Sequence, residues 1–345
     1  MIEFLFFIFS FLLLFIVNSF LFKNNLLIEN KNLISFPHKE FALDRNIKTI
    51  LSGGIFFSFF LFFTIKINIS LFYYLLIIFI IGLLSDLKLL NSPIYRIILQ
   101  IIATTLFIYF NENFDIQTRI IFLDNILSNK IFQIVFCTFC ILILINGFNF
   151  IDGVNLSSSL NFLIIIFFLN FLFKKYNVEN INYFIYLIIL IFTFCIYNFY
   201  SRSFLGDGGV YLLSAFISER VIFLSSVSKE ISPYYIVNLL WYPAFENLFS
   251  IIRKIIDNKS PSTPDNSHLH HYLLSYVKKN FFLRKQYLQS SVSGIIINLF
   301  ILVMLILATC NISVTKYQIM ILFINITSYL VIYTYLKKNY LYKKN

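Results

Sequence analysis

Charged residues are scarce in this chain. Only 12% of its 345 residues are Asp, Glu, Lys or Arg, whereas 59% are hydrophobic and 20% are aromatic. A soluble domain carries about twice that charged fraction, because charge keeps its surface in water. The composition therefore excludes a soluble globular protein and indicates a chain embedded in a membrane.

Cysteine is also rare, and its positions argue against a disulfide framework. All four cysteines, among them Cys137 and Cys140, lie in apolar stretches. Their Cys-x-x-Cys spacing occurs in redox pairs, but an apolar helical setting favours small packing residues. The sequence His-Glu-x-x-His is absent, which argues against a membrane metalloprotease.

Long apolar runs are abundant. Stretches such as "FLFFIFSFLLLFIV" and "NFLIIIFFLNFLF" approach the roughly 20 residues that cross a bilayer as a helix. They lack the alternation of a membrane barrel, and the first run has no small-residue cleavage site after it, so we expect it to be retained. The sequence predicts an all-α, polytopic membrane bundle forming a single domain over 1–345. About eleven spans are expected, at 2–22, 49–65, 70–85, 97–110, 131–148, 158–173, 183–199, 209–226, 233–252, 289–310 and 317–336.

Positive charge gathers on one side of these spans. If the N-terminus is outside, most of the 27 lysines and arginines fall in segments on the cytosolic side. The positive-inside rule therefore predicts an N-out, C-in orientation in the membrane. The net charge of +11 then reflects topology and contact with membrane lipids, not nucleic-acid binding.

The segments rich in Asp, Gly and His fall on the same predicted cytosolic face. We expect active-site loops there at about 23–48, 85–96, 146–157, 200–209 and 253–288. They contain "GLLSDLKLLNSP", "NGFNFIDGVN", "SRSFLGDGG" and "PDNSHLHHYLL". Outer loops show no comparable clustering, so the chemistry is expected at the cytoplasmic ends of the helices.

Three aspartates on this face form a candidate phosphate and metal site. Taken alone, Asp86 suits a helix-end or pairing role as well as a catalytic one, and Asp152 is explained equally by an Asx turn or by a catalytic role. Asp207 lies in Gly-Asp-Gly-Gly, where glycines allow a phosphate to approach the backbone and a carboxylate suits Mg²⁺, or Mn²⁺ in its place. Together the three indicate phosphate chemistry at the membrane surface.

In this order the motifs resemble those of the polyprenyl-phosphate N-acetylhexosamine-1-phosphate transferases, glycosyl transferase family 4. That superfamily includes the phospho-MurNAc-pentapeptide translocase and the undecaprenyl-phosphate GlcNAc-1-phosphate transferases. The resemblance covers residues 48 to about 274. It implies transfer of a sugar 1-phosphate from a UDP-sugar to polyprenyl phosphate, releasing UMP and starting a cell-envelope glycan.

The resemblance also implies roles for particular residues. Asp207 corresponds to the family's magnesium ligand, and Asn149 and Asp152 to active-site residues of the Asn-x-x-Asp-Gly motif. Asp86 corresponds to the second residue of an Asp-Asp pair that handles the lipid phosphate, so we expect Asp86 and Asp152 to act in catalysis. Lys48 and Arg253 are further candidates for binding the substrate, although Arg253 is equally explained by positive-inside anchoring.

The chain departs from the family pattern at several positions. Ser85 replaces the first aspartate of the pair, Asn155 replaces a later aspartate, and Leu156 replaces the glycine after it. The usual His-x-x-Pro before Lys48 is missing. A lipid phosphate is already largely ionised near neutral pH, so positioning and a metal ion can suffice without a strong base.

Three of the four histidines, His268, His270 and His271, lie close together. Structural zinc is usually held by more dispersed ligands, often including cysteine, so a zinc site is disfavoured. We expect these histidines to bind the diphosphate of the donor instead.

Other functions remain open at this stage. A metal-ion or proton-coupled transporter would place acidic residues near span midpoints, where they are scarce. A catalytically degenerate family member would fit the Ser85 and Asn155 changes. The sequence leaves open whether the chain forms a homodimer, and it does not identify the sugar.

Overall fold

A computed structural model describes residues 1–29, 49–111, 116–178, 183–258, 260 and 267–341. Within these ranges the fold is helical, apart from two short strands, β1 (Ile28–Glu29) and β2 (Thr49–Ile50), which pair antiparallel. The helices are α1 (Ile2–Lys23), α2 (Gly53–Ser58), α3 (Leu61–Ile65), α4 (Ile69–Asp86), α5 (Pro93–Phe110), α6 (Ile121–Leu127), α7 (Lys130–Ile151), α8 (Ser157–Lys175), α9 (Tyr183–Phe199), α10 (Gly206–Val227), α11 (Pro233–Ile256), α12 (Leu269–Asn280), α13 (Gln286–Thr309) and α14 (Thr315–Leu341).

Each of the eleven predicted spans contains helical structure, which confirms the polytopic bundle, although the span at 49–65 begins with strand β2. Eight helices of the described chain are long and apolar enough to cross a membrane, and two shorter apolar helical stretches lie at Gly53–Ile65 and Tyr183–Phe199. The eleventh, α11, is 24 residues long but contains Pro243, Glu246, Arg253 and Lys254. Its polarity explains why a hydropathy criterion alone passes over it.

The predicted boundaries differ from the observed ones where capping residues set the ends. The span expected at 97–110 already begins at Pro93, which occupies the first turn of α5, where its missing N–H costs nothing. Asn129 accepts a hydrogen bond from the N–H of Ile131 and starts α7. The span expected at 49–65 is divided into α2 and α3 by a tight turn at Phe59 and Phe60.

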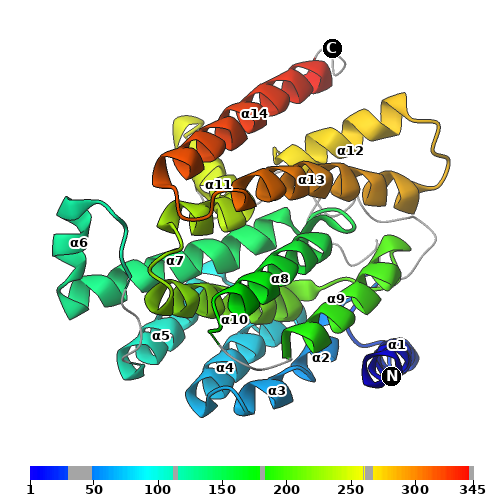
Figure 1. Cartoon of the computed structure of the whole chain (residues 1–345). Coiled ribbons are helices and arrows are strands. Elements are labelled where there is room, and N and C mark those ends of the chain that lie inside the picture. The colour runs from blue at the N-terminus through cyan, green and yellow to red at the C-terminus, as the bar shows by residue number, and fades with distance from the viewer. Residues whose placement is uncertain (30–48, 112–115, 179–182, 259, 261–266, 342–345) are drawn as a thin grey trace.

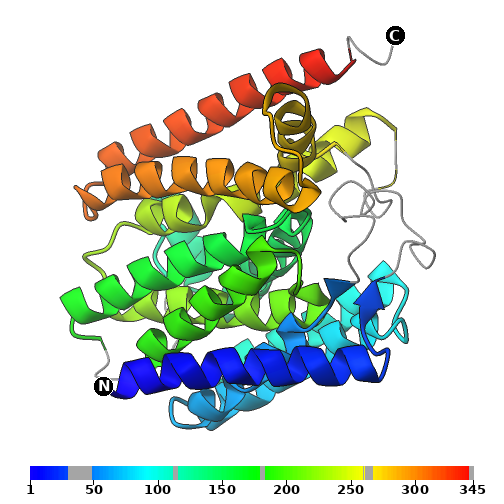
Figure 2. The ribbon, with the colours of Figure 1, turned by 90° about the vertical axis from the view of Figure 1, so that its right-hand side faces the viewer.

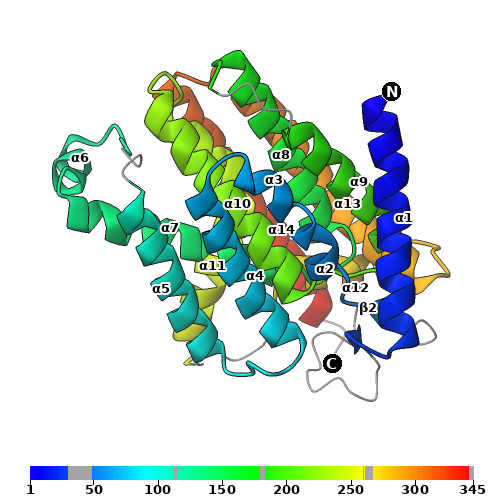
Figure 3. The ribbon, with the colours of Figure 1, turned by 90° about the horizontal axis from the view of Figure 1, so that it is seen from below.

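The long helices run side by side from one end of the bundle to the other. Figure 2 shows α1 starting at the end opposite to the one where α14 finishes. The β1–β2 pair lies at the second end, and Figure 3 shows the same arrangement from below. We call this second end the site face. The two termini thus lie on opposite sides, as predicted, while their orientation in the membrane stays a prediction.

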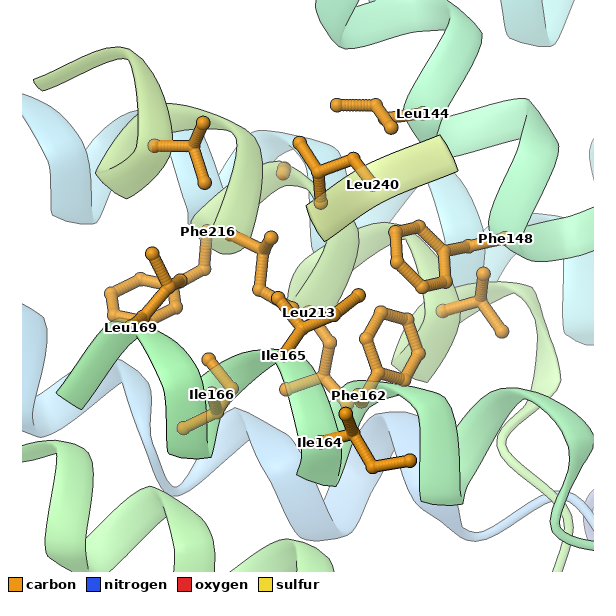
Figure 4. Close-up of a cluster of buried hydrophobic side chains, with 14 of the residues drawn as sticks. Leu144, Phe148, Phe162, Ile164, Ile165, Ile166, Leu169, Leu213, Phe216 and Leu240 are labelled. Atoms are coloured by element: carbon orange, nitrogen blue, oxygen red, sulfur yellow. The ribbon is translucent and has the colours of Figure 1, made fainter. Parts of the chain in front are cut away.

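Helix α10 lies at the centre of the bundle (Figure 1) and packs against α2, α4, α7 and α8. Of its apolar span 78% is buried, against 17% for the peripheral α1. Figure 4 shows the core beside it, where Phe148 of α7 stacks on Phe162 of α8 with ring centroids 4.2 Å apart. A rigid central helix of this kind holds the residues at its first turn in place.

The peripheral helices present large apolar side chains outward. On α5, for example, Ile94, Tyr95, Ile98 and Ile102 are exposed. An apolar surface this extensive is costly in water and suits lipid. The structure therefore agrees with a membrane protein.

Candidate active site

Glycines bring three helices together at the site face. The N–H of Gly53 on α2 donates to the carbonyl of Phe204, just before α10, at 3.0 Å. A Cβ atom on Gly82 of α4 would lie 2.6 Å from the carbonyl oxygen of Asp207 and 2.6 Å from the Cα of Gly208. Only glycine allows so close a backbone contact, and this contact places the end of α4 beside the start of α10.

Asp86, the last residue of α4, caps α10. Its Oδ1 accepts from the N–H of Asp207 at 2.8 Å, and its Oδ2 accepts from the N–H of Gly208 at 2.9 Å. These two N–H groups have no partner inside the helix, and a carboxylate is favoured at a helix N-terminus. Gly206 makes room for it, with φ +67° and a position where a Cβ would lie 2.6 Å from Asp86 Oδ2.

The Asp207 side chain lies in a small polar cluster with Ser85 and Arg96. Its Oδ2 accepts from Ser85 Oγ at 2.6 Å and from Arg96 Nη1 at 2.5 Å. The same Arg96 nitrogen donates to Ser85 Oγ at 2.7 Å. The side chains of Arg96 and Asp207 are each 20% exposed. Two residues predicted from sequence, Asp86 and Asp207, are therefore brought together with an arginine that was not singled out.

The Asn-x-x-Asp-Gly motif forms the end of α7. Asn149 lies in the last turn, and Asp152 follows the helix as its C-cap, with its N–H near the carbonyl of Asn149 at 3.4 Å. Gly153 comes next and is packed against His270, because a Cβ at Gly153 would lie 2.0 Å from His270 Nε2. The structure thus joins this motif to the histidine cluster, although they are far apart in sequence.

Glu246 of α11 holds the beginning of the histidine segment. Its Oε1 lies 2.9 Å from His268 Nδ1 and 3.4 Å from the N–H of Leu269, at the start of α12. Its Oε2 accepts from the hydroxyl of Tyr329 on α14 at 2.6 Å. This carboxylate is 1% exposed, so three helices converge on one buried charge that is satisfied by hydrogen bonds.

Arg253, about two turns after Glu246 on α11, supports the same segment. It donates to the carbonyl of Ser267, to the Tyr333 hydroxyl at 3.0 Å and to Ser250 Oγ at 3.2 Å. The Tyr333 hydroxyl also donates to Ser267 at 3.1 Å. Lys254 lies over the ring of Phe150, 5.6 Å from its centroid. The role of Arg253 in binding substrate stays a prediction. In the structure, Arg253 holds Ser267, at the start of the histidine segment, by a hydrogen bond to its carbonyl.

The three histidines are buried and close to one another. Ring centroids lie 5.5 Å apart for His268 and His270 and 4.1 Å apart for His270 and His271. In the part of the chain that the structure describes, no three His, Cys, Asp or Glu side chains gather in a way that could hold a metal ion. Lys48 and residues 261–266, which precede the histidine segment, lie outside the described residues.

The aspartate and histidine groups are connected through α5 and α7. Asn146 Nδ2 of α7 donates to Gln100 Oε1 of α5 at 3.3 Å. Arg96 lies one turn before Gln100, and Asn149 lies about one turn after Asn146. The hydrogen bond between Asn146 and Gln100 thus lies one turn away from Arg96, which contacts Asp207, and one turn away from Asn149, whose motif packs on His270.

Glycosyl transferase family 4 is the family whose sequence model matches this chain, over residues 68–225. The matched region contains Asp86, the Asn149–Asp152 motif and Asp207, the residues whose geometry is described above. This match shows that the chain is similar to glycosyl transferase family 4 over somewhat less than half of its length.

Two curated proteins are similar to parts of the chain. A Bacillus subtilis protein, named "Probable undecaprenyl-phosphate N-acetylglucosaminyl 1-phosphate transferase", is 36% identical over 87 residues, which is 24% of each chain. A Thermotoga maritima protein, named "Undecaprenyl-phosphate alpha-N-acetylglucosaminyl 1-phosphate transferase", is 35% identical over 71 residues. That match covers 21% of this chain and 23% of the relative. The aligned segments thus span about a quarter of either relative.

The departure from the family pattern at Asn155 has a structural counterpart. Asn155 is buried, and its Nδ2 donates to Ser201 Oγ at 2.7 Å and to Ser291 Oγ at 3.2 Å. Its N–H donates to Ser290 Oγ at 2.9 Å. The side chain therefore ties the turn before α8 to α13 and to the loop before α10. Leu156 follows with φ +64°, an uncommon conformation for a branched residue.

The donor set at Asp207 suits a magnesium ion shared with a substrate. Mg²⁺ is commonly bound by one or two carboxylates together with phosphate oxygens and water, not by a cage of protein ligands. Asp207 offers one carboxylate whose side chain is 20% exposed, while both oxygens of Asp86 accept backbone N–H groups. These residues fit a metal ion held mainly by Asp207 and by phosphate.

Proposed function

We propose that this family member transfers a sugar 1-phosphate, specifically an N-acetylhexosamine 1-phosphate, from a UDP-sugar to polyprenyl phosphate. The products are UMP and a lipid-linked diphosphate sugar that starts a cell-envelope glycan. The observation that carries the proposal is the meeting of Asp86 and Asp207 at the glycine junction, beside Arg96. The names of the two relatives support a hexosamine donor and an undecaprenyl phosphate acceptor.

The reaction requires a phosphate oxygen of the lipid to attack the β-phosphorus of the donor. A new P–O bond forms there, the bond to the UMP oxygen breaks, and UMP leaves with that electron pair. The attacking phosphate is already largely ionised at neutral pH. Replacement of the first carboxylate by Ser85 is therefore compatible with the chemistry, because positioning and charge stabilisation supply most of the catalysis in phosphoryl transfer.

The residues take their roles from their positions. Asp207 would hold Mg²⁺, which when bound neutralises phosphate charge. Asp86 orients the Asp207 loop by capping α10. Asn149 and Asp152 would bind the nucleotide sugar, and the histidine segment, packed on Gly153, would bind its diphosphate with Lys48 and Arg253 as further cationic groups.

The membrane location suits both substrates. A polyprenyl phosphate has its chain in the bilayer and its headgroup at the surface. The apolar helices end at the site face, which would lie at the level of that headgroup. A UDP-sugar reaches the same place from water. We therefore place the reaction at the cytoplasmic face of the plasma membrane, and the transporter alternative becomes unnecessary because the buried polar cluster lies at helix ends.

Replacing Asp207 by Asn tests this function. The purified protein in lipid nanodiscs is given undecaprenyl phosphate, Mg²⁺ and a panel of UDP-N-acetylhexosamines, and UMP release is measured. We expect release by the wild type with at least one donor, and a loss of about a hundredfold or more in Asp207→Asn, as expected for the loss of a metal ligand central to phosphoryl transfer.

Two outcomes would contradict the proposal. Near-normal UMP release by Asp207→Asn would remove Asp207 from the metal site. A wild type that is folded but releases no UMP with any donor would favour a degenerate family member. A lipid extract that gains radiolabel from one UDP-sugar would identify the sugar.

A further inference from the structure

The ion pair between Arg96 and Asp207 uses the same carboxylate that the proposed metal ion would need. Asp207 Oδ2 accepts from both Arg96 Nη1, at 2.5 Å, and Ser85 Oγ, at 2.6 Å. A guanidinium and a divalent cation repel each other strongly at such short range. Arg96 and Mg²⁺ therefore compete for Asp207.

Arg96 is held less completely than most arginines in ion pairs. Arginine–carboxylate pairs are frequently bidentate, with two parallel N–H donors. Here one nitrogen, Nη1, makes the contacts with both Asp207 and Ser85. The Nε atom of Arg96 is buried and makes no hydrogen bond within the described residues. An unsatisfied buried N–H is costly, so this guanidinium has donor capacity for an additional acceptor.

Ser85 contacts both Arg96 and Asp207. An aspartate at position 85, as in the usual pattern of the family, would offer the arginine a carboxylate of its own. The serine hydroxyl instead donates to Asp207 and accepts from Arg96. The charge of Arg96 is therefore balanced by Asp207, the residue proposed to bind the metal ion.

We propose that Arg96 is an exchangeable counter-cation of the site. It neutralises Asp207 in the free protein, yields that carboxylate to Mg²⁺, and then binds a phosphate oxygen of the substrate. The phosphate step rests on the proposed function, whereas the competition with the metal ion does not. Arg96 would thereby couple metal binding to substrate binding.

Metal affinity in the absence of substrate tests the competition directly. Mn²⁺ binding to the purified full-length protein in nanodiscs is measured by electron paramagnetic resonance, without nucleotide or lipid phosphate. We expect Arg96→Gln to bind Mn²⁺ about fivefold more tightly than the wild type, because an interfering cation next to the ligand is removed. Asp207→Asn should lose this binding.

Arg202 provides a matched control on the same face. It is exposed and lies over the ring of Tyr200, 5.9 Å from its centroid. Arg202→Gln removes an equal charge without touching Asp207, so its Mn²⁺ affinity should stay close to that of the wild type. Thermal unfolding of each variant verifies that it is folded.

An Arg96→Gln protein that is folded and binds Mn²⁺ equally or less tightly would overturn the proposal, since a purely structural arginine predicts one of those results. Retained Mn²⁺ binding in Asp207→Asn would overturn it as well. For the phosphate step, we expect Arg96→Gln to raise the KM for the UDP-sugar more than it lowers kcat. If the wild type itself releases no UMP, that result counts against the proposed function. The comparison of Mn²⁺ affinities would still test the competition between Arg96 and the metal ion.

Discussion

Gly206 lies immediately before Asp207, with its α-carbon facing the carboxylate of Asp86. Its φ is +67°, and a Cβ there would lie 2.6 Å from Asp86 Oδ2. A residue with a side chain is strained in that conformation by about 1–2 kcal/mol, and it would also push away the cap of α10. The placement of Asp207 therefore depends on a neighbour that takes no part in chemistry.

Replacement of Gly206 by Ala should lower both stability and activity. We expect UMP release to fall at least about tenfold, since small displacements of catalytic groups have large effects. Thermal unfolding and UMP release are measured together. Gly208→Ala is the matched control, because a Cβ there would lie 3.3 Å from Asp86 Oδ2 and needs only a small adjustment. Equal effects in the two variants would show that Gly206 is not special.

The sequence identified the aspartates but not their partners. Asp86 and Asp207 were recognisable because carboxylates beside glycines at helix ends suit phosphate and metal chemistry. The capping role of Asp86 was invisible, since the N–H groups that it accepts belong to residues about 120 positions later in the chain. Arg96 lies at the end of the expected active-site loop 85–96, but its role could not be assigned because its partner is set by helix packing.

At the scale of elements, α14 is part of the support for the histidine segment. Tyr329 donates to Glu246, and Tyr333 donates to the carbonyl of Ser267. In the sequence, the C-terminal region is recognisable only as two apolar spans, at 289–310 and 317–336. A tyrosine that faces a buried carboxylate looks, in sequence, like any other aromatic residue in an apolar span, so this function of α14 needed the structure.

Glu246 variants test that support. Glu246→Ala removes the partner of His268, Leu269 and Tyr329 together. Hydrogen bonds to a charged group are each worth about 1.5–3 kcal/mol, so we expect UMP release to fall by tenfold or more. Tyr329→Phe, which removes one hydroxyl, should cost about 1 kcal/mol of stability and leave most activity. Activity in Glu246→Ala equal to that in Tyr329→Phe would contradict this ordering.

At the scale of the whole molecule, the spans were predictable because apolar length reports the thickness of the hydrocarbon layer directly. The break between α2 and α3 and the amphipathic helix α12 were not predicted. Both are set by local contacts at the site face: α2 packs against the start of α10, and α12 begins at a residue held by Glu246. Hydropathy along the sequence does not predict such contacts between residues far apart in the chain.

Orientation in the membrane can be tested with a native cysteine. Cys310 is exposed in the turn between α13 and α14, at the end opposite to the site face, whereas Cys137 and Cys195 are buried. An N-out, C-in protein should react at Cys310 with a membrane-impermeant maleimide added to spheroplasts. The Cys310→Ser variant should lose this labelling. Labelling of Cys310 only in inverted vesicles would place the site face outside.

The cap that Asp86 provides for α10 also bears on how the site can change in evolution. Ser85 and Asp86 are adjacent, yet only Asp86 caps the N-terminus of α10. A mutation at position 85 alters the charge of the cluster and leaves the start of α10 intact. A mutation at position 86 removes the acceptor for two backbone N–H groups, so folding itself selects against it. In this chain the second residue of the pair therefore carries the helix cap, while the first contributes a hydroxyl to the cluster with Asp207 and Arg96.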